Sequence, residues 1–339
     1  METIALRLND DFGIDALTYD KVVVHDPAPH EVLVRMRAVS LNYRDLMMVE
    51  GRYDPHVHKP LIPCSDGAGE VIATGSDVTV FRPGDRVVAP FFLNWLNGPV
   101  THAAAASALG GAVDGTLCTD RLFPSSALVP IPENLSFQEA ATFPCAAVTA
   151  WHALVSTANI GSNDMVLLLG TGGVSIFGLQ IAKLRGAKTI VTSSSDEKLQ
   201  RAKALGADHT INYKQHPDWD AKVWELTQKS GVTHVLETGG AGTLPHSLRA
   251  AGTGAQVSVI GVFTGMEQSF NIGPILMKSL RVQGIYVGSK AMLAESLQSF
   301  SNAHVKPVID HVYTFEKAKD AFHALATAQH VGKLVITFP

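Results

Sequence analysis

Glycines that follow a short apolar run are the first residues in this chain whose spacing suggests chemistry. Residues 165–175 read M-V-L-L-L-G-T-G-G-V-S, and the apolar pattern then resumes at helical spacing. Such glycines permit a tight turn and let the backbone approach a pyrophosphate, while the new helix directs its unpaired N–H groups at the phosphates. We therefore expect a dinucleotide to bind at this turn. The expected contacts are Gly170, Gly172, Gly173 and Val174.

The residues after this turn favour a β-α-β unit over an isolated turn. The segment K-T-I-V-T at 188–192 predicts a second strand directly after the helix, which is the context that the glycine pattern requires. The third glycine of the usual pattern is replaced by Ser175, a residue small enough for close helix–strand packing. The alternative is that the glycines serve only the turn.

The end of the second predicted strand indicates which nicotinamide cofactor is used. NAD-binding chains usually carry Asp or Glu here, which accepts a hydrogen bond from the ribose 2′-hydroxyl. This chain carries hydroxyls instead, followed by a cation, and a tyrosine follows the third strand; the residues are Ser193, Ser194, Ser195, Lys198 and Tyr213. Since these groups suit a 2′-phosphate, we expect NADPH. The alternative role of Ser195 or Asp196, as the cap of the next helix, is compatible with this interpretation.

The composition excludes several classes of protein. The 339 residues carry a formal net charge of −4 and are 46% hydrophobic, without basic runs or an apolar stretch long enough to span a membrane. We expect neither a nucleic-acid partner nor a membrane partner. The three unpaired-looking cysteines and the acidic N-terminus, which lacks a signal core, predict a cytoplasmic protein.

The texture of the sequence divides the chain into two domains. Residues 1–130 form short alternating segments broken by Gly and Pro, which predicts a β-rich, barrel-like domain. Residues 131–288 alternate strands with helices and predict an α/β domain built on a doubly wound, six-stranded parallel sheet. The final segment, 289–339, is too short to fold alone, so we expect it to complete the first domain.

Several motifs in this order resemble the medium-chain dehydrogenase/reductases. They are S-L-N-Y-R-D-L-M at 40–47, E-G-R-Y at 50–53, D-G-A-G-E-V at 66–71, P-G-D-R-V at 83–87, the glycine turn, and G-K-L-V-I at 332–336. The resemblance covers essentially the whole chain. It implies a GroES-like catalytic domain, a Rossmann domain, and hydride transfer in a cleft between them.

In the zinc enzymes of this superfamily, a cysteine, a histidine and a second cysteine hold the catalytic zinc. The resemblance places these ligands at three positions of this chain, and only the second cysteine is present. The positions carry Asn42, Ser65 and Cys145, and the region 91–120, where relatives have a four-cysteine structural zinc lobe, contains only Cys118. One soft ligand cannot hold a zinc ion that needs three protein ligands. We therefore expect no metal. The chain is then similar to the zinc-independent branch, which includes quinone oxidoreductases and enone or enoyl reductases.

Without a metal, a hydrogen-bond donor must stabilise the negative charge that hydride addition creates. The resemblance indicates Asn42 as that donor and places Tyr53 near a small, hydrophobic, electrophilic substrate. Alternatively, Asn42 bonds its own backbone in a turn, and Tyr53 is a packing ring. Further expected cofactor contacts, each with a turn or a solvated lysine as the alternative, are Thr149, Gly239, Gly261, Phe263 and Lys333.

Two segments have open roles. The apolar stretch 91–115 either lines a substrate cleft with Phe91, Phe92 and Trp95 or packs against the body of the protein. The segment 281–288 is expected to be an edge strand through which the chain forms a homodimer. Two other functions remain: an NADP-linked alcohol or aldehyde oxidoreductase without zinc, and an NADPH-binding protein without catalysis.

Overall fold

The computed structural model describes residues 1–339, and the chain divides into two compact units. Unit 1 comprises Met1–Val148 and Gly288–Pro339, and unit 2 comprises Thr149–Val287. Unit 2 is thus inserted between two parts of unit 1, as the sequence predicts. The boundary after Val148 lies later than the expected residue 130. No helix is both long and apolar enough to cross a membrane.

The later boundary has a packing cause, because the helical segment before Val148 belongs to the core of unit 1. The ring of Phe143 meets the ring of Phe300 edge to face, with centroids 5.2 Å apart. Lys306 also forms an ion pair of 3.0 Å with Glu139. Residues 134–147 therefore pack on the returning C-terminal segment, a tertiary contact that local texture does not reveal.

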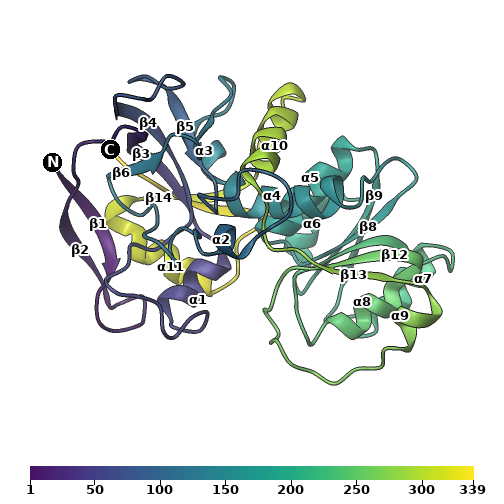
Figure 1. The fold of residues 1–339 in the computed structure, drawn as a ribbon. Helices are drawn as coiled ribbons and strands as arrows, with labels where there is room; N and C mark the ends of the chain where they lie inside the picture. Colours follow the sequence, from purple (N-terminus) through teal and green to yellow (C-terminus); the bar gives the residue numbers. More distant parts are fainter. The chain divides into compact units, whose positions relative to one another are not determined.

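Unit 1 is built mainly on antiparallel strands, with one parallel pair, β14 and β15 (Figure 1). A separate pair is formed by β1 (Glu2–Leu8) and β2 (Leu17–Val23). The main sheet has the order β14-β15-β3-β4-β5-β7, and β6 also pairs with β3. Its strands are β3 (Glu31–Ser40), β4 (Asp66–Thr74), β5 (Arg86–Ala89), β6 (Asp120–Pro124), β7 (Val129–Pro130), β14 (Ile309–Thr314) and β15 (Lys333–Thr337).

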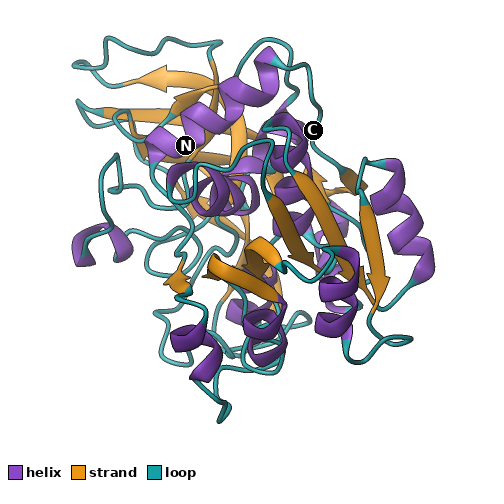
Figure 2. Cartoon of the chain, turned by 90° about the vertical axis from the view of Figure 1, so that its right-hand side faces the viewer, coloured by secondary structure: helices purple, strands orange, loops and turns teal.

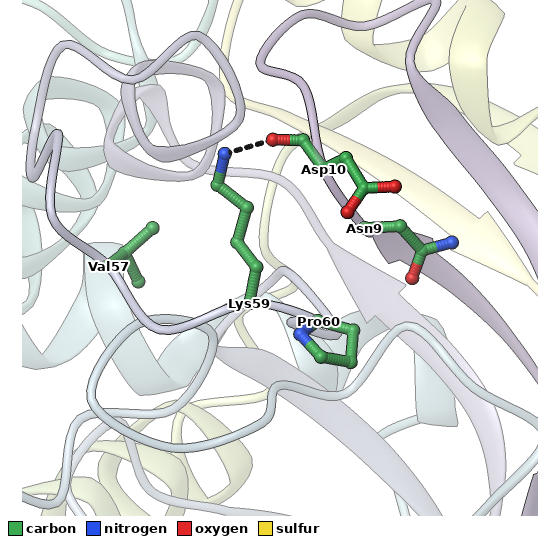
Figure 3. A pocket seen from close by; sticks show the side chains of 5 residues that line it. All are labelled: Asn9, Asp10, Val57, Lys59 and Pro60. Atoms are coloured by element: carbon green, nitrogen blue, oxygen red, sulfur yellow. Dashed lines mark hydrogen bonds between the residues drawn. The ribbon is translucent and has the colours of Figure 1, made fainter.

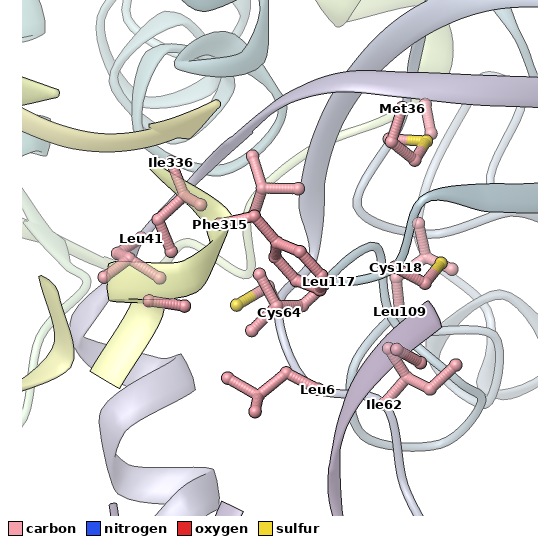
Figure 4. Packing of buried hydrophobic residues seen from close by; sticks show 14 of the residues in the cluster. Leu6, Met36, Leu41, Ile62, Cys64, Leu109, Leu117, Cys118, Phe315 and Ile336 are labelled. Carbon is pink, nitrogen blue, oxygen red and sulfur yellow. The ribbon is translucent and has the colours of Figure 1, made fainter. Parts of the chain in front are cut away.

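Helices connect these strands. They are α1 (Tyr43–Val49), α2 (His102–Ala105), α3 (Phe137–Ala141), η1 (Phe143–Ala147), α10 (Lys290–Asn302), η3 (Phe315–Lys317) and α11 (Ala318–Ala326). The core of unit 1 joins residues that are far apart in the sequence, including Leu6, Met36, Cys64, Leu117 and Ile336 (Figure 4). The C-terminal strand β15 thus completes the sheet that the N-terminal segment begins, which confirms the GroES-like domain.

Unit 2 has the predicted doubly wound sheet. Six parallel strands lie in the order β10-β9-β8-β11-β12-β13. Their bounds are β8 (Met165–Leu169), β9 (Lys188–Ser193), β10 (His209–Asn212), β11 (Val232–Glu237), β12 (Ala251–Val259) and β13 (Arg281–Gly284). The apolar run of β8 is buried because strands pair with both of its edges and helices cover both faces.

The helices of unit 2 flank the sheet on both faces, α5 and α6 on one side and α7 and α8 on the other (Figures 1 and 2). Their bounds are α5 (Gly173–Leu184), α6 (Asp196–Ala204), α7 (Trp219–Leu226), α8 (Leu244–Ala250) and α9 (Gly273–Met277). The connecting segment forms α4 (Val148–Trp151) and η2 (His152–Ser156). The chain builds the sheet outward from β8 in one direction and from β11 in the other, so the strand order reverses between these two neighbours. Ligands of such sheets bind in the loops at the carboxyl ends of the strands at this point.

Candidate functional site

Three neighbouring strands bring a group of polar side chains together inside unit 1. In the register of the sheet, Ser40 at the end of β3 faces Asp66 at the start of β4 and Val335 in β15. The chain turns at Asn42, the N-cap of α1, whose backbone N–H donates to Oδ2 of Asp45 at 2.8 Å. Lys333 begins β15 on the other side of β3. The ends of these strands therefore place Asn42, Asp66 and Lys333 next to one another.

The side chains of this group form a closed ring of interactions, which we call the Lys333 ring. Lys333 Nζ donates to Oδ1 of Asn42 and lies 3.8 Å from Oδ2 of Asp66. Asn42 Nδ2 donates to Oγ of Ser65 at 3.4 Å, and that hydroxyl donates to Oδ1 of Asp66 at 2.7 Å. Backbone groups complete it, since Nζ also donates to the Leu41 carbonyl at 2.7 Å and the Cys145 N–H donates to Oδ2 of Asp66 at 3.3 Å.

The Lys333 ring is removed from water. The solvent-exposed fraction is 2% for Lys333, zero for Asp66 and 8% for Asn42. Burial raises the pKa of Asp66 to about 6, although the Lys333 ammonium opposes this shift. A buried ion pair stabilises a fold weakly at best, because desolvation offsets the attraction. The Lys333–Asp66 ion pair therefore contributes little to the stability of the fold, and its effect is to orient the polar groups around it.

A second polar group lies beside the ring, on α1. Arg44 forms an ion pair of 3.5 Å with the buried Asp45 and donates to the Leu109 carbonyl at 2.7 Å. Its guanidinium lies over the rings of Tyr53 and Phe91, at 5.4 Å and 5.1 Å from their centroids. The half-exposed Tyr53 is thus held by a cation–π contact. The structure brings Asn42 into the Lys333 ring and places Tyr53 at Arg44.

The stretch 91–115 packs within unit 1. Phe91, Phe92 and Trp95 are buried. The ring centroids of Phe91 and Phe92 are 4.6 Å apart, and those of Phe92 and Trp95 are 5.7 Å apart. The indole N–H of Trp95 donates to the Gly98 carbonyl at 2.9 Å. Of the two roles that the sequence leaves open for these aromatic residues, the structure supports packing.

In unit 2 the glycine turn leads from β8 into α5 with open space in front of it. Gly170 has φ +76°, the left-handed region that glycine favours, and Gly172 is the N-cap of the helix. A Cβ added to either glycine would meet no atom within 4 Å. The turn therefore has room for a ligand at the positive end of a 12-residue helix.

The close contact between helix and strand is made by a glycine outside the usual pattern. Ser175, at the expected position, donates its hydroxyl to the Leu169 carbonyl at 2.6 Å. A Cβ on Gly178, one turn further along, would lie 2.8 Å from Cδ2 of both Leu168 and Leu236. Sequence analysis missed Gly178, although its spacing of three residues from Ser175 on one helix face is a usable signal.

The side chains at the end of β9 carry hydroxyl groups, and the carboxylate that follows them in the sequence bonds to other residues. Ser193 Oγ accepts from the Ser195 N–H at 3.3 Å, and Ser195 caps α6 by accepting from the Lys198 N–H. Asp196 accepts from Asn212 at 2.7 Å and Gln215 at 2.8 Å. The nearest acidic group thus bonds toward β10.

Two of the other expected cofactor residues have clear structural roles. Gly239 donates its N–H to Oε1 of the fully buried Glu237, and a Cβ on Gly261 would lie 1.9 Å from the Thr238 carbonyl. Both glycines shape the turns at the carboxyl ends of β11 and β12. Glu237, which also accepts from Gly240, Thr243 and Ser247, organises these turns and was missed by sequence analysis.

The remaining expected cofactor residues differ in exposure. Thr149 is buried in α4, whereas Tyr213 and Phe263 are 41% and 60% exposed. Lys333 was also expected to contact the cofactor. In the structure its Nζ is buried in unit 1 and donates to the Leu41 carbonyl and to Asn42. A lysine at a strand start reads as solvated in sequence, and only the pairing of β15 with β3 turns it inward.

The positions that match the zinc ligands of relatives do not provide a zinc-binding donor set. They supply an amide, a hydroxyl that donates to Asp66, and the thiol of Cys145, whose pKa is raised well above its usual range by burial. No group of three or more His, Cys, Asp or Glu side chains is placed to hold a metal. The Lys333 ammonium, a cation already among these residues, adds repulsion.

A separate surface pocket in unit 1 contains none of the expected site residues. It has a volume of about 510 Å³ and is lined by Asn9, Asp10, Val57, Lys59 and Pro60. Figure 3 shows Lys59 Nζ donating across it to the Asp10 carbonyl, at 2.5 Å. Its ammonium also lies 3.6 Å from the ring centroid of Phe12.

Comparison with protein families matches both units. Residues 28–133 match the alcohol dehydrogenase GroES-like domain, and residues 173–302 match the family described as zinc-binding dehydrogenase. These matches agree with the antiparallel unit 1 and the doubly wound sheet of unit 2.

Individual relatives match over nearly the whole chain. A zinc-type alcohol dehydrogenase-like protein of Schizosaccharomyces pombe is 44% identical over 314 residues, 91% of each chain. A quinone oxidoreductase of Pseudomonas aeruginosa is 29% identical over 96% of each chain. A crystal structure from Sinorhizobium meliloti, titled as a candidate alcohol dehydrogenase, is 42% identical, with a TM-score of 0.92 over 100% of this chain and 99% of that chain.

Proposed function

Because this chain belongs to the medium-chain dehydrogenase/reductases, a superfamily of oxidoreductases that use nicotinamide cofactors, we propose that it is an NADPH-dependent reductase that works without a metal. The acceptor is a quinone or an activated C=C bond, as in enones and enoyl compounds. NADPH supplies the hydride when bound. The observation that carries the proposal is the Lys333 ring, which presents an amide donor where zinc enzymes of this fold carry metal ligands.

The residues of unit 2 support the cofactor preference. Ser193 ends β9 and Ser194 follows it, while the nearby Asp196 bonds to Asn212 and Gln215. A carboxylate directed at the ribose would repel a 2′-phosphate, whereas hydroxyls and a cation such as Lys198 favour it. The turn at Gly170 and Gly172 receives the pyrophosphate at the N-terminus of α5.

The residues of unit 1 support the reaction. When hydride adds to the β-carbon of an enone, the C=C electron pair moves toward the carbonyl, whose oxygen becomes an enolate. The Asn42 amide donates to that oxygen, and a proton from water then completes the new C–H bond. NADPH and one proton are thus consumed, and NADP⁺ and the saturated ketone are released. A quinone takes up the same hydride and proton to become a hydroquinone.

The names of two similar proteins, the Schizosaccharomyces pombe relative and the Sinorhizobium meliloti structure, favour a second candidate, an NADP-linked alcohol or aldehyde oxidoreductase. In that reaction hydride adds to a carbonyl carbon and Asn42 donates to the resulting alkoxide. The same donor serves both reactions, so the acceptor must be determined by assay.

The exposed apolar side chains of unit 2 support a homodimer, which we include in the proposal. The edge strand β13 pairs with β12 along one side, and the preceding segment carries large exposed side chains. They are Met266, Phe270, Ile272, Leu276 and Met277, and Val282 is exposed on β13 itself. A second copy of the chain would pair with this edge and cover these residues.

The test is a screen of NADPH oxidation against naphthoquinones, enones, enoyl thioesters and aldehydes, together with alcohol-dependent reduction of NADP⁺. We expect turnover with a quinone or an enone, and faster turnover with NADPH than with NADH. Turnover confined to alcohols and aldehydes would select the second candidate. NADPH binding without turnover of any acceptor would contradict both.

A further inference from the structure

The hydrogen bonds of the Lys333 ring run in one direction, from donor to acceptor, and Lys333 sets that direction. An ammonium group has three N–H donors and no acceptor. Lys333 Nζ donates to the Leu41 carbonyl and to the Asn42 side chain, and its third side faces Oδ2 of Asp66 at 3.8 Å. The atom of Asn42 that meets Nζ is therefore its carbonyl oxygen.

This contact determines which way the Asn42 amide points. A side-chain amide can rotate by half a turn, which exchanges its oxygen and nitrogen. With the oxygen bonded to the ammonium, Nδ2 must point away from Lys333, and it donates to Oγ of Ser65 at 3.4 Å. The reversed amide would set its N–H₂ group against the ammonium. Lys333 therefore excludes it.

The opposite side of the ring gives the same direction. Asp66 Oδ1 accepts from the Ser65 hydroxyl at 2.7 Å, which leaves the lone pairs of Ser65 Oγ to accept from Asn42 Nδ2. Asp66 also accepts the Cys145 N–H and faces the ammonium. The carboxylate and the ammonium thus act on Asn42 from two sides and favour one amide orientation.

We propose that Lys333 is a positioning residue of this enzyme, which holds the Asn42 amide so that its second N–H₂ hydrogen is a fixed donor to the acceptor's oxygen. This inference rests on the proposed function. The Lys333–Asp66 pair acts through Asn42 instead of contacting the substrate. We also expect the amide, hydroxyl and thiol of Asn42, Ser65 and Cys145 to bind no zinc.

The test compares three variants of the full-length protein. Lys333→Met removes the charge at similar length, and the double variant Lys333→Met with Asp66→Asn removes both members of the pair, so that no unpaired buried charge prevents folding. Asn42→Asp keeps an acceptor for Lys333 but has no N–H donor. The matched control is Lys290→Met, which removes another lysine of unit 1, whose Nζ donates to the Ser126 carbonyl at 2.6 Å.

Two readouts separate orientation from structure. The first is the pair of Asn42 side-chain N–H₂ signals in ¹⁵N-asparagine-labelled protein, identified by their loss in Asn42→Asp. We expect these signals to shift and to exchange faster with water in the double variant, and to stay in place in Lys290→Met. The second is turnover. We expect kcat to fall on the order of 10²-fold in Asn42→Asp and at least about 10-fold in the double variant, with NADPH affinity unchanged.

Unchanged Asn42 signals in the double variant would overturn the positioning role, whether or not an acceptor has been found. An absence of turnover in the wild-type protein, with Asn42 signals that depend on Lys333, would instead contradict the proposed function and leave the orientation supported. Elemental analysis adds an independent outcome. One zinc per chain that is lost in Cys145→Ser would overturn the positioning role of Lys333, because a metal bound at Asn42, Ser65 and Cys145 would then orient the amide.

Discussion

Lys333 and Asn42 are 291 residues apart in the sequence, yet the ammonium of one donates a buried hydrogen bond to the side-chain oxygen of the other. The contact exists because β15 pairs with β3, which ends just before Asn42. It leaves the amide nitrogen of Asn42 on the side away from the charge. The expected catalytic donor is therefore oriented by a residue that lies almost at the end of the chain.

Asn42→Ala and Tyr53→Phe test the two residues expected to act on the substrate. We expect Asn42→Ala to lower kcat by about 10²- to 10³-fold, because a neutral donor to the developing oxyanion is lost. Tyr53→Phe keeps the ring that stacks on Arg44 and removes only the hydroxyl. If that hydroxyl contacts the substrate or passes a proton, kcat or KM changes. Steady-state kinetics measure both, and wild-type values in both variants would contradict the site assignment.

Gly172→Ala and Gly178→Ala separate ligand binding from packing in the same turn and helix. A methyl group on Gly178 would lie 2.8 Å from Leu168 and Leu236, so we expect a loss of stability of about 1–3 kcal/mol. A methyl group on Gly172 meets no protein atom, so we expect a smaller loss of stability and a weaker affinity for NADPH. Thermal melts and cofactor titrations measure the two effects. Tight NADPH binding by Gly172→Ala would show that the pyrophosphate lies elsewhere.

Ser194→Asp tests the preference for NADPH at the end of β9. The new carboxylate would repel the 2′-phosphate, so we expect the Kd for NADPH to rise by about 10-fold or more, equivalent to about 1.4 kcal/mol, while the Kd for NADH changes little or falls. Lys198→Ala should weaken NADPH in the same selective way. The control is Lys188→Ala, at the exposed opposite end of β9. Equal losses for both cofactors would contradict the assignment.

The raised pKa of Asp66 predicts a dependence on pH. The folded pKa is about 6 and the unfolded pKa about 3.9, so between these values the folded chain holds a proton that the unfolded chain has released. The contribution of Asp66 to stability is therefore fully present below about pH 4 and lost as the pH rises through about 6. We expect the melting temperature of the wild type relative to Asp66→Asn to fall across this window and to stay level above it. If the difference in melting temperature between the wild type and Asp66→Asn does not vary with pH, the raised pKa of Asp66 is contradicted.

Val282→Lys tests the proposed dimer. Val282 lies on the edge strand β13, where a charge would oppose pairing with a second copy and the burial of the nearby apolar side chains. We expect a monomer in analytical ultracentrifugation with NADPH affinity retained. Val80→Lys is the control, because Val80 is 69% exposed and belongs to unit 1. A wild-type chain that sediments as a monomer would remove the dimer from the proposal.

Local patterns in the sequence determined the architecture of this protein. The apolar run 165–169, the glycine turn and the strand after it predict one β-α-β unit, and the structure has it as β8, α5 and β9. The insertion of unit 2 was also predictable, because the residues after 288 are too few to fold alone. Asn42 was identified through motif positions, and Ser193 through its place after a strand. The β-α-β unit and Ser193 follow from periodicity and spacing within a short segment, whereas Asn42 follows from the resemblance to the medium-chain dehydrogenase/reductases.

Only the tertiary structure decided where the buried charges lie. Lys333 and Asp66 read as ordinary polar residues at strand ends, and nothing near either residue in the sequence indicates that the two meet. Their encounter depends on the pairing of β15, β3 and β4, which burial of apolar surface drives over separations of hundreds of residues. The sequence by itself therefore determined the folds of the two units and the cofactor turn. The tertiary structure decided the orientation of Asn42, because a hydrogen-bond direction is set by the partner that folding brings to it.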